Sequence, residues 1–250
     1  MDLELQGKCA IITGGTRNLG RAISLGFLQE GAKVVATYLR DDASAQEFLD
    51  VVPSDRRDDI RIYKLDVSSA ISCRKLCVRA LREFSRIDVL VNNASVIYRQ
   101  SPDEITDKDF EAIMGLTLRS TLYMMRAVFP VMKQAGGGRI VNISTAGVYT
   151  GNASELLYIC AKAGVEAATR AYVRLGSNFG ITANAIAPHV IDIGMGRETI
   201  SQDPTIVDRI PLQRIGRVEE YVNLVLFLSS RACEYMAGQI LHLNGARLMR

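Results

Sequence analysis

The sequence predicts a single α/β domain built on a doubly wound, seven-stranded parallel sheet with helices on both faces. Short runs rich in β-branched residues alternate with longer amphipathic stretches along the whole chain. A glycine-rich turn follows the first of these runs. The length of 250 residues, with 48% hydrophobic content, suits one substantial core, and no repeat or low-complexity tract interrupts it. We therefore treat residues 1–250 as one domain.

The order of the predicted elements follows this alternation. Strands are predicted at residues 8–13, 33–38, 60–65, 89–92, 139–143, 182–187 and 239–243. Helices are predicted at residues 21–30, 73–84, 110–133, 157–178 and 219–229. Strands joined by helical crossovers lie parallel and are buried on both faces, which explains their continuous apolar runs.

Charge and composition limit the classes of partner. The formal net charge of +3 comes from 30 basic and 27 acidic side chains that are interspersed, so we expect no nucleic-acid partner. Residues 1–5 carry acids where a signal peptide would carry positive charge, and no apolar run approaches the ~20 residues of a membrane span. The five cysteines show no ligand-like spacing, so we expect a reducing, cytoplasmic setting and no metal site.

The glycine-rich turn at residues 13–20 is the first candidate site. It lies between the first strand and the first helix, where the helix N-terminus offers free N–H groups and a positive dipole to a phosphate. Its candidate binding residues are Gly14, Thr16, Arg17, Asn18 and Leu19. This position in a βαβ unit predicts a dinucleotide site.

The turn resembles the T-G-x-x-x-G-x-G signature of the short-chain dehydrogenases/reductases, which are Rossmann-type proteins. Asn18 stands where the middle glycine of that signature usually lies. Asparagine tolerates positive φ better than other residues with a side chain, so we expect a modified phosphate site. Asp66 and Val67 match the family's adenine contacts, and Asn93 and Ala94 belong to its N-N-A-G turn, with Ser95 in place of the glycine.

The end of the second strand bears on the choice of cofactor. An acid there would hydrogen-bond the ribose 2′-OH of NAD(H), but the sequence has Tyr38 and then Arg40. Arg17 and Arg40 could pair with a 2′-phosphate through charge-assisted hydrogen bonds, or both could be solvated. The sequence therefore favours NADP(H) over NAD(H).

Tyr158 and Lys162 are the candidate catalytic pair. They are four positions apart on a predicted helix, so both project from one face. They are similar to the family's Y-x-x-x-K segment, in which the tyrosine exchanges a proton with the substrate and the lysine also holds the nicotinamide ribose. A nearby ammonium favours the phenolate of a tyrosine, whose ordinary pKa is ~10.

Two further positions of the family's tetrad are altered. The family has a serine thirteen positions before the tyrosine, and this chain has Thr145, which keeps the hydroxyl and adds a methyl group. Thr117 stands where the family has an asparagine, seven residues after Phe110. Its backbone carbonyl could still hold a relay water if the helix is locally distorted there.

The segment after the sixth predicted strand resembles N-x-I-x-P-G-x-x-x-T. Pro188 and Ile191 are its candidate cofactor contacts, whereas His189 replaces the glycine and Ile193 the threonine. His189 could act as an acid or base, or only fill a turn. Residues 190–212 are expected to form a lid over the substrate.

The resemblance extends over the whole chain and is strongest to 3-oxoacyl-acyl-carrier-protein reductases. It implies an oxidoreductase that transfers hydride between NADP(H) and a small carbonyl or alcohol substrate, assembled as a homotetramer or homodimer. Arg174 matches a position used for carrier-protein docking, but Pro130 stands where a second basic residue is expected, so a carrier-bound substrate stays open. The alternative is a catalytically impaired or non-enzymatic relative that retains the fold, because several positions that the family fixes are altered here.

Overall fold

A computed structural model gives the fold of residues 2–249, apart from the side chain of Met195. Its strands form one seven-stranded sheet in the order β3-β2-β1-β4-β5-β6-β7, and every adjacent pair is parallel. The strands are β1 (Cys9–Ile12), β2 (Lys33–Tyr38), β3 (Ile60–Lys64), β4 (Val89–Asn92), β5 (Gly138–Ile143), β6 (Ile181–Pro188) and β7 (Ile240–Leu243). The predicted doubly wound sheet is confirmed.

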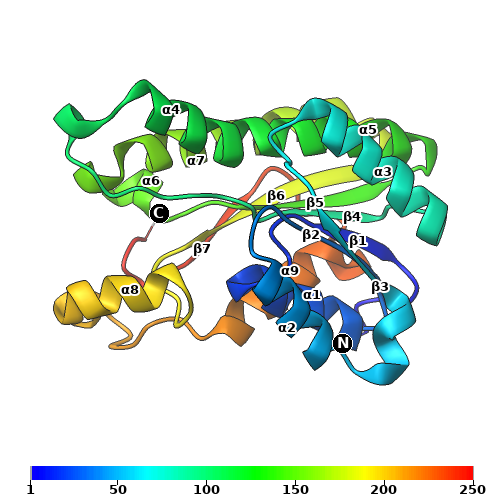
Figure 1. The fold of residues 1–250 in the computed structure, drawn as a ribbon, viewed down its shortest axis with the longest axis horizontal. Helices are drawn as coiled ribbons and strands as arrows, with labels where there is room; N and C mark the ends of the chain where they lie inside the picture. Colours follow the sequence, from blue (N-terminus) through cyan, green and yellow to red (C-terminus); the bar gives the residue numbers. More distant parts are fainter. Residues whose placement is uncertain (1, 250) are drawn as a thin grey trace.

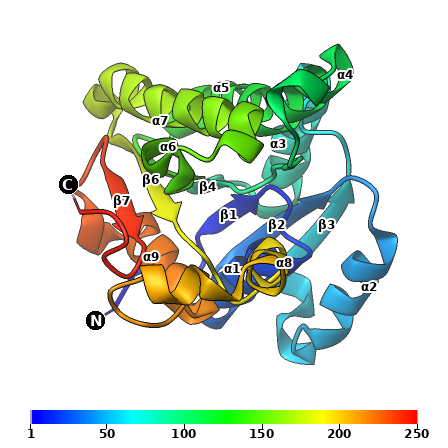
Figure 2. The ribbon, with the colours of Figure 1, turned by 90° about the vertical axis from the view of Figure 1, so that its left-hand side faces the viewer.

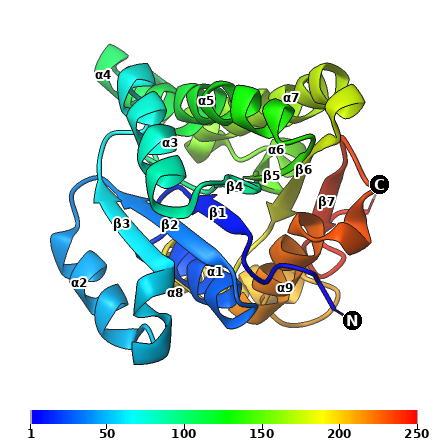
Figure 3. The same cartoon turned by 90° about the vertical axis from the view of Figure 1, so that its right-hand side faces the viewer.

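Helices cover both faces of this sheet, as Figure 1 shows. They are α1 (Asn18–Gln29), α2 (Asp42–Val51), α3 (Ala70–Phe84), α4 (Asp107–Ile113), α5 (Ser120–Gln134), α6 (Gly147–Thr150), α7 (Leu156–Gly176), α8 (Met195–Gln202) and α9 (Val218–Ser229). Helices α3, α4, α5 and α7 lie on one face, and α1, α2 and α9 lie on the other (Figures 1 and 2). Viewed from the other end, β3 and α2 lie at one side of the sheet and β7 at the other (Figure 3). The chain is one Rossmann-like domain.

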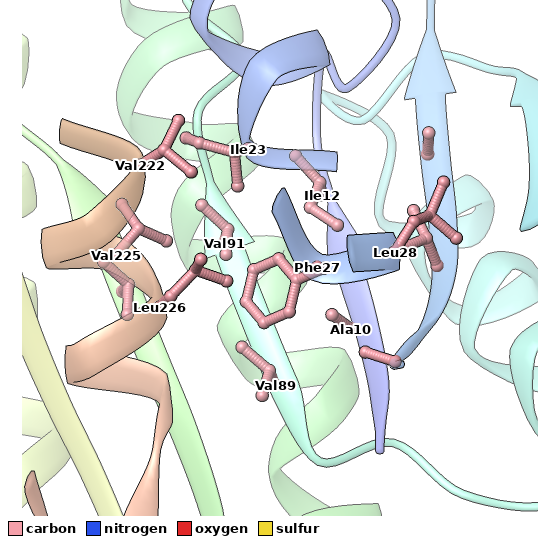
Figure 4. Packing of buried hydrophobic residues seen from close by; sticks show 14 of the residues in the cluster. Ala10, Ile12, Ile23, Phe27, Leu28, Val89, Val91, Val222, Val225 and Leu226 are labelled. Atoms are coloured by element: carbon pink, nitrogen blue, oxygen red, sulfur yellow. The ribbon is translucent and has the colours of Figure 1, made fainter. Parts of the chain in front are cut away.

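The core on the α1 side explains how these layers hold together. Phe27 of α1 is fully buried and packs between the sheet and α9 (Figure 4). The sheet contributes Ala10, Ile12, Val89 and Val91, and α9 contributes Val222, Val225 and Leu226. The intervening strand residues belong to a second cluster on the opposite face, because successive side chains of a strand alternate. Each large side chain buried in this way contributes ~1.5–3 kcal/mol.

The predicted helix at residues 110–133 is interrupted by a π-helical turn at Met114–Arg119. The hydroxyl of Ser120 donates to the carbonyl oxygen of Leu116 at 2.5 Å, and that of Thr121 donates to the carbonyl oxygen of Thr117 at 2.9 Å. Hydroxyls that bond back to the preceding turn in this way bend and locally distort helices. The local distortion that a relay water at Thr117 would require is therefore present.

Three helices, α2, α6 and α8, were not predicted. The α2 helix has a weak apolar stripe, with only Ala45 and Phe48 buried. None of the described side chains of α8 is buried. The single turn of α6 buries none of its residues. Periodicity detects a helix by the face that it buries, so it could not detect these three helices.

The strand order places the site. β1 lies between β2 and β4, so the chain reverses direction across the sheet at the β1–β4 boundary. Ligands of open α/β sheets bind beyond the carboxyl ends of the strands at such a point.

Candidate functional site

A cleft of about 760 Å³ lies beyond the carboxyl ends of the strands. Its walls come from the segments that follow β1 to β6, together with parts of α4, α7 and α8. Most of the residues singled out in the sequence line it: Gly14, Thr16, Arg17, Asn18, Leu19, Tyr38, Arg40, Asp66, Val67, Asn93, Ala94, Thr145, Tyr158, Pro188 and Ile191. Lys162 and Thr117 are 2% and 0% exposed, and they are not among its lining residues.

The glycine-rich turn has the shape that a close approach to a phosphate requires. Gly14 has φ +63°, and a Cβ atom at Gly20 would overlap the carbonyl of Gly14. Asn18 adopts φ +47°, the left-handed conformation that asparagine tolerates. Helix α1 begins directly after Arg17 without a side-chain cap, so the first N–H groups of this helix are available to an anion.

Asn93 ties this turn to the end of β4. Its side-chain amide donates to the carbonyl oxygens of Thr13 and Gly14 at 3.0 and 3.1 Å. The N–H groups of Asn93 and Ala94 both donate to Thr13 Oγ1 at 3.0 Å. Asn93 and Ala94 therefore fix the glycine-rich turn relative to the middle of the cleft.

An acid that the sequence reasoning missed lies at the end of the cleft near β2. Asp41 caps α2, accepts from Ser44 N at 3.0 Å, and forms an ion pair with Arg17 at 3.2 Å. The hydrogen bonds from Ser44 and the Arg17 guanidinium hold the pKa of the Asp41 carboxyl below its usual range. Tyr38 donates to Asp42 at 2.8 Å, and Arg40 is exposed. Asp41 could have been recognised as a helix N-cap residue, but this required a prediction of α2, which the sequence analysis did not make.

Asp66 and Pro188 line the cleft beyond β3 and β6. Asp66 accepts from Ser68 N at 2.8 Å, and Val67 beside it is buried. The carbonyl of Pro188 accepts from Ala146 N at 2.7 Å, which links the segment after β6 to the segment after β5. Ile191 lies on the same wall of the cleft as Pro188.

Tyr158 lies in the first turn of α7 and is 7% exposed. Burial raises the pKa of its phenol well above the usual range, and the nearby carboxylate of Glu155 adds to this. A hydrogen bond with the side chain of Ser95 and the charge of Arg99 lower the same pKa. Ser95, which replaces the family's glycine, thus lies against the phenol; the substitution gave no indication of this contact.

Lys162 follows one turn later on α7. Its Nζ atom donates to the carbonyl oxygen of Ile143 at 2.5 Å and lies 5.5 Å from the centroid of the Tyr158 ring. Burial lowers the pKa of Lys162 to about 7. The helix therefore brings the two residues together as the spacing predicts.

The hydroxyls after β5 point in different directions. Thr145 lines the cleft, and its Oγ1 accepts from Gly147 N at 3.1 Å. Ser144 Oγ donates to the buried carboxylate of Glu166 at 2.6 Å, and the Tyr149 hydroxyl donates to the same carboxylate. Of Ser144 and Thr145, only Thr145 has its hydroxyl available beside the cleft, as its position predicts.

Thr117 lies within the π-helical turn and is fully buried. Its Oγ1 has no hydrogen-bond partner among residues 2–249. Its carbonyl oxygen, the predicted holder of a relay water, accepts from the Thr121 hydroxyl. A carbonyl has two lone pairs, so one can still accept from a water.

His189 also lines the cleft. Burial, with added repulsion from Arg247 and Arg209, lowers the pKa of its imidazole. A neutral imidazole is therefore the favoured form, and its Nδ1 has no partner within the described part of the chain.

Two other structural findings concern the rest of the chain. No helix within residues 2–249 is long and apolar enough to cross a bilayer. No group of three or more His, Cys, Asp and Glu side chains among the described residues is placed to hold a metal ion.

Known proteins resemble the chain over almost its full length. The sequence profile of the family described as enoyl-(acyl carrier protein) reductase matches residues 14–245. An acetoacetyl-CoA reductase of Rhizobium meliloti is 32% identical over 242 residues, which cover 96% of this chain and 98% of that protein. A 3-oxoacyl-(acyl-carrier-protein) reductase of Thermotoga maritima is 31% identical over 248 residues, with coverages of 97% and 98%.

The fold has solved counterparts. A crystal structure of the 3-ketoacyl-(acyl-carrier-protein) reductase of Brucella melitensis complexed with NADH superposes with a TM-score of 0.89 at 25% identity. That match covers 98% of this chain and 100% of the other. The glycine-rich turn, the Tyr158–Lys162 pair and these matches lead to one conclusion: the chain belongs to the short-chain dehydrogenase/reductase family of oxidoreductases and is similar to its 3-oxoacyl-(acyl-carrier-protein) reductases.

Proposed function

We propose that the protein is an NADP(H)-dependent ketoreductase that reduces a ketone to a secondary alcohol, with Tyr158 as the proton donor. The observation that carries this proposal is the placement of Tyr158 and Lys162 one helical turn apart beside a cleft that is also lined by the glycine-rich turn. A ketone and a dinucleotide could lie end to end in a cleft of this extent.

The residues fit a nicotinamide cofactor. The uncapped start of α1 and the close approach of Gly14 and Gly20 suit a pyrophosphate. Asp66 and Val67 would contact the adenine, and Asn93, Ala94, Pro188 and Ile191 would line the path to the nicotinamide. Lys162, behind Tyr158 on α7, would hold the ribose beside the nicotinamide. NADPH supplies the hydride that forms the new C–H bond at the carbonyl carbon.

The chain's own part in the chemistry is proton transfer and orientation. The Tyr158 hydroxyl gives its proton to the carbonyl oxygen as negative charge develops there, so that the alcohol O–H bond forms and a phenolate remains. The Lys162 ammonium stabilises that phenolate. Thr145 would donate a hydrogen bond to the same substrate oxygen, and the carbonyl of Thr117 would hold a water through which the proton is replaced.

The preference for NADP(H) rests on two arginines at the end of the cleft near β2. Arg17 and Arg40 line this end of the cleft with Asp41, and the neighbouring carboxylate of Asp42 is paired with Lys64, so the group carries a net positive charge. A 2′-phosphate would meet a net positive site and could replace Asp41 as the partner of Arg17. Tyr38 would pack against the adenosine from the same wall.

The substrate class follows from the named relatives, which are reductases of acetoacetyl-CoA and of 3-oxoacyl groups on the acyl carrier protein. We infer that this chain acts on 3-oxoacyl thioesters or on ketones of similar shape. Residues 190–212 would serve as the lid over this substrate, and the protein would assemble as a homotetramer or homodimer, which light scattering of the purified chain can test.

The test is an assay of cofactor oxidation with acetoacetyl-CoA and a panel of ketones, run in parallel with NADPH and NADH. We expect turnover with at least one 3-oxoacyl thioester and a higher kcat/KM for NADPH than for NADH. The altered Thr117 and Thr145 positions favour a second candidate, a relative that retains the fold without catalysis. Binding of NADPH without its oxidation across the whole panel would establish that candidate and overturn our proposal.

A further inference from the structure

Arg99 is a charged residue of the cleft that neither the phosphate turn nor the proton transfer uses. It lies in the loop that follows β4, and its side chain is 27% exposed. Its Nε atom donates to Glu155 Oε1 at 3.0 Å, and its terminal nitrogen NH2 donates to Thr199 Oγ1 at 2.8 Å. Arg99, Glu155 and Thr199 all line the cleft together with Tyr158.

These contacts join three elements that are far apart in the sequence. Glu155 is the N-cap residue of α7, directly before the turn that carries Tyr158. Thr199 lies in the middle of α8, within the segment expected to be the lid. Figure 2 shows α8 on the side of the sheet that carries α1, whereas α6 and α7 lie on the opposite side. Arg99 therefore spans the cleft opening from the catalytic helix to α8.

Little apolar packing holds helix α8 in place. Its described side chains are exposed or half-buried, so it gains little from apolar packing. A hydrogen bond from a charged group is roughly twice as strong as a neutral one, and here Glu155 fixes the orientation of the guanidinium. Lysine could not replace Arg99 here, because an ammonium group lacks the rigid fork of the guanidinium that reaches Glu155 and Thr199 together.

The same ion pair lies beside the catalytic tyrosine. The charged or titratable groups that face Tyr158 are Glu155 from the start of α7, Arg99 from the loop after β4 and Lys162 from the next turn of α7. The carboxylate of Glu155 raises the pKa of Tyr158, and the guanidinium of Arg99 lowers it. The two members of one ion pair thus act on the phenol in opposite directions.

We propose that Arg99 is a latch that holds α8 across the cleft against the start of α7 and that, with Glu155, sets the electrostatic environment of Tyr158. Arg99 is thus a positioning residue. Its second role rests on the proposed function of Tyr158, whereas its first role does not. Opening of the cleft for substrate would break the bond to Thr199, whereas the Glu155 bond would keep Arg99 in place.

Hydrogen–deuterium exchange of the whole protein with NADPH present tests the latch. Arg99→Gln and Thr199→Val should each speed exchange within residues 195–202 by on the order of tenfold, because each removes the hydrogen bond between Arg99 and α8. The matched control is Arg119→Gln, which removes an equal charge from another ion pair of the cleft, with Glu111 at 3.3 Å. It should leave exchange in residues 195–202 unchanged.

The pH dependence of alcohol oxidation tests the electrostatic role, because oxidation needs the phenolate. Arg99→Gln should move the rising limb of kcat to higher pH, and Glu155→Gln should move it to lower pH, each by on the order of half a unit. Thr199→Val keeps the ion pair, so it should raise KM and leave the limb in place. A merely structural role of Arg99 would not produce shifts of opposite sign.

The outcomes separate the two halves of the proposal. Unchanged exchange in residues 195–202 for both Arg99→Gln and Thr199→Val would overturn the latch, whether or not the enzyme turns over. Shifts of the limb in the same direction for Arg99→Gln and Glu155→Gln would overturn the electrostatic role. A wild-type protein without turnover would contradict the proposed function alone, and exchange would still decide the latch.

Discussion

The ammonium of Lys162 is bonded to the backbone of the central sheet: its Nζ atom donates to the carbonyl oxygen of Ile143, the last residue of β5, at 2.5 Å. A lysine at 2% exposure is costly to bury as a charge, and burial lowers its pKa to about 7. The lysine that we propose to act in the reaction therefore reduces the stability of the fold.

Lys162→Met should stabilise the protein and abolish turnover. The pKa of Lys162 is lower in the folded chain than its ordinary value of 10.5, so between these values the unfolded chain binds more protons and stability rises with pH. The gain from the substitution should be ~2–4 kcal/mol below pH 7 and should shrink as the pH approaches 10. Thermal unfolding at pH 6 and pH 9.5 measures it, with the exposed Lys108→Met as control; equal gains at both pH values would contradict the account.

Asn18, in the glycine-rich turn, lies beside Gly194, which belongs to the segment expected to be the lid. Asn18 has φ +47°, and a Cβ atom at Gly194 would lie 2.8 Å from the Asn18 amide. Asn18→Ala should therefore cost ~1 kcal/mol of stability, and Asn18→Gly should cost less, because glycine accepts positive φ. Gly194→Ala should weaken NADPH binding, and Asn18→Gly in the same chain should restore part of it. Calorimetry measures the stability of the variants, and fluorescence titration measures their affinity for NADPH. Equal stability of Asn18→Ala and Asn18→Gly would contradict the backbone strain at Asn18.

Glu166 holds the segment after β5 in place. It is 2% exposed and accepts hydrogen bonds from Ser144 and Tyr149. Glu166→Leu should destabilise the protein by ~1–3 kcal/mol, because it removes the acceptor of the buried Ser144 hydroxyl and the carboxylate to which the half-buried Tyr149 hydroxyl donates. Glu166→Gln keeps one acceptor oxygen and should cost less. Urea unfolding measures the difference in stability between the two variants. Equal free energies of unfolding for Glu166→Leu and Glu166→Gln would contradict this role of Glu166.

Thr145 offers the hydroxyl beside Tyr158 in the proposed reaction. Thr145→Val removes that hydroxyl with little change in shape and should lower kcat/KM on the order of a hundredfold. Thr145→Ser keeps the donor and should retain the activity. Steady-state kinetics with the best ketone of the panel provides the measurement, and full activity of the valine variant would exclude Thr145 from the chemistry.

Arg40 and Arg17 should decide the choice of cofactor. Arg40→Ala and Arg17→Ala are each expected to raise the KM for NADPH about tenfold and to leave the KM for NADH nearly unchanged, since only NADPH carries the 2′-phosphate. The effect should weaken at high salt, because both side chains are solvent-accessible. Arg231→Ala, an exposed arginine far along the chain, is the control. Equal losses for the two cofactors would contradict the proposed NADP(H) preference.

The sheet and the glycine-rich turn could be predicted because they follow from local rules. Strands buried on both faces, such as Val89–Asn92, are continuous apolar runs, and a turn that binds a phosphate must exclude side chains at Gly14 and Gly20. The Tyr158–Lys162 pair also follows from helical spacing. Each of these features is determined by residues that lie close together in the sequence.

The features that the sequence did not reveal depend on contacts between distant segments. The ion pair of Arg17 with Asp41 and the bridge from Arg99 to Glu155 and Thr199 join residues 24 to 100 positions apart. The contact of Ser95 with Tyr158 is of the same kind. Helices α2 and α8 were missed because they bury too few side chains to produce a periodic pattern.

The most direct test of the central claim is a paired measurement on Tyr158→Phe, which removes one hydroxyl from a fully packed side chain. NADPH binding by fluorescence titration should stay within a few-fold of the wild type, because the hydroxyl is expected to act in proton transfer rather than in holding the cofactor. Reduction of the best ketone, followed as NADPH oxidation in the same sample, should fall by at least about a thousandfold. Undiminished reduction by Tyr158→Phe would contradict the assignment of Tyr158 as the proton donor.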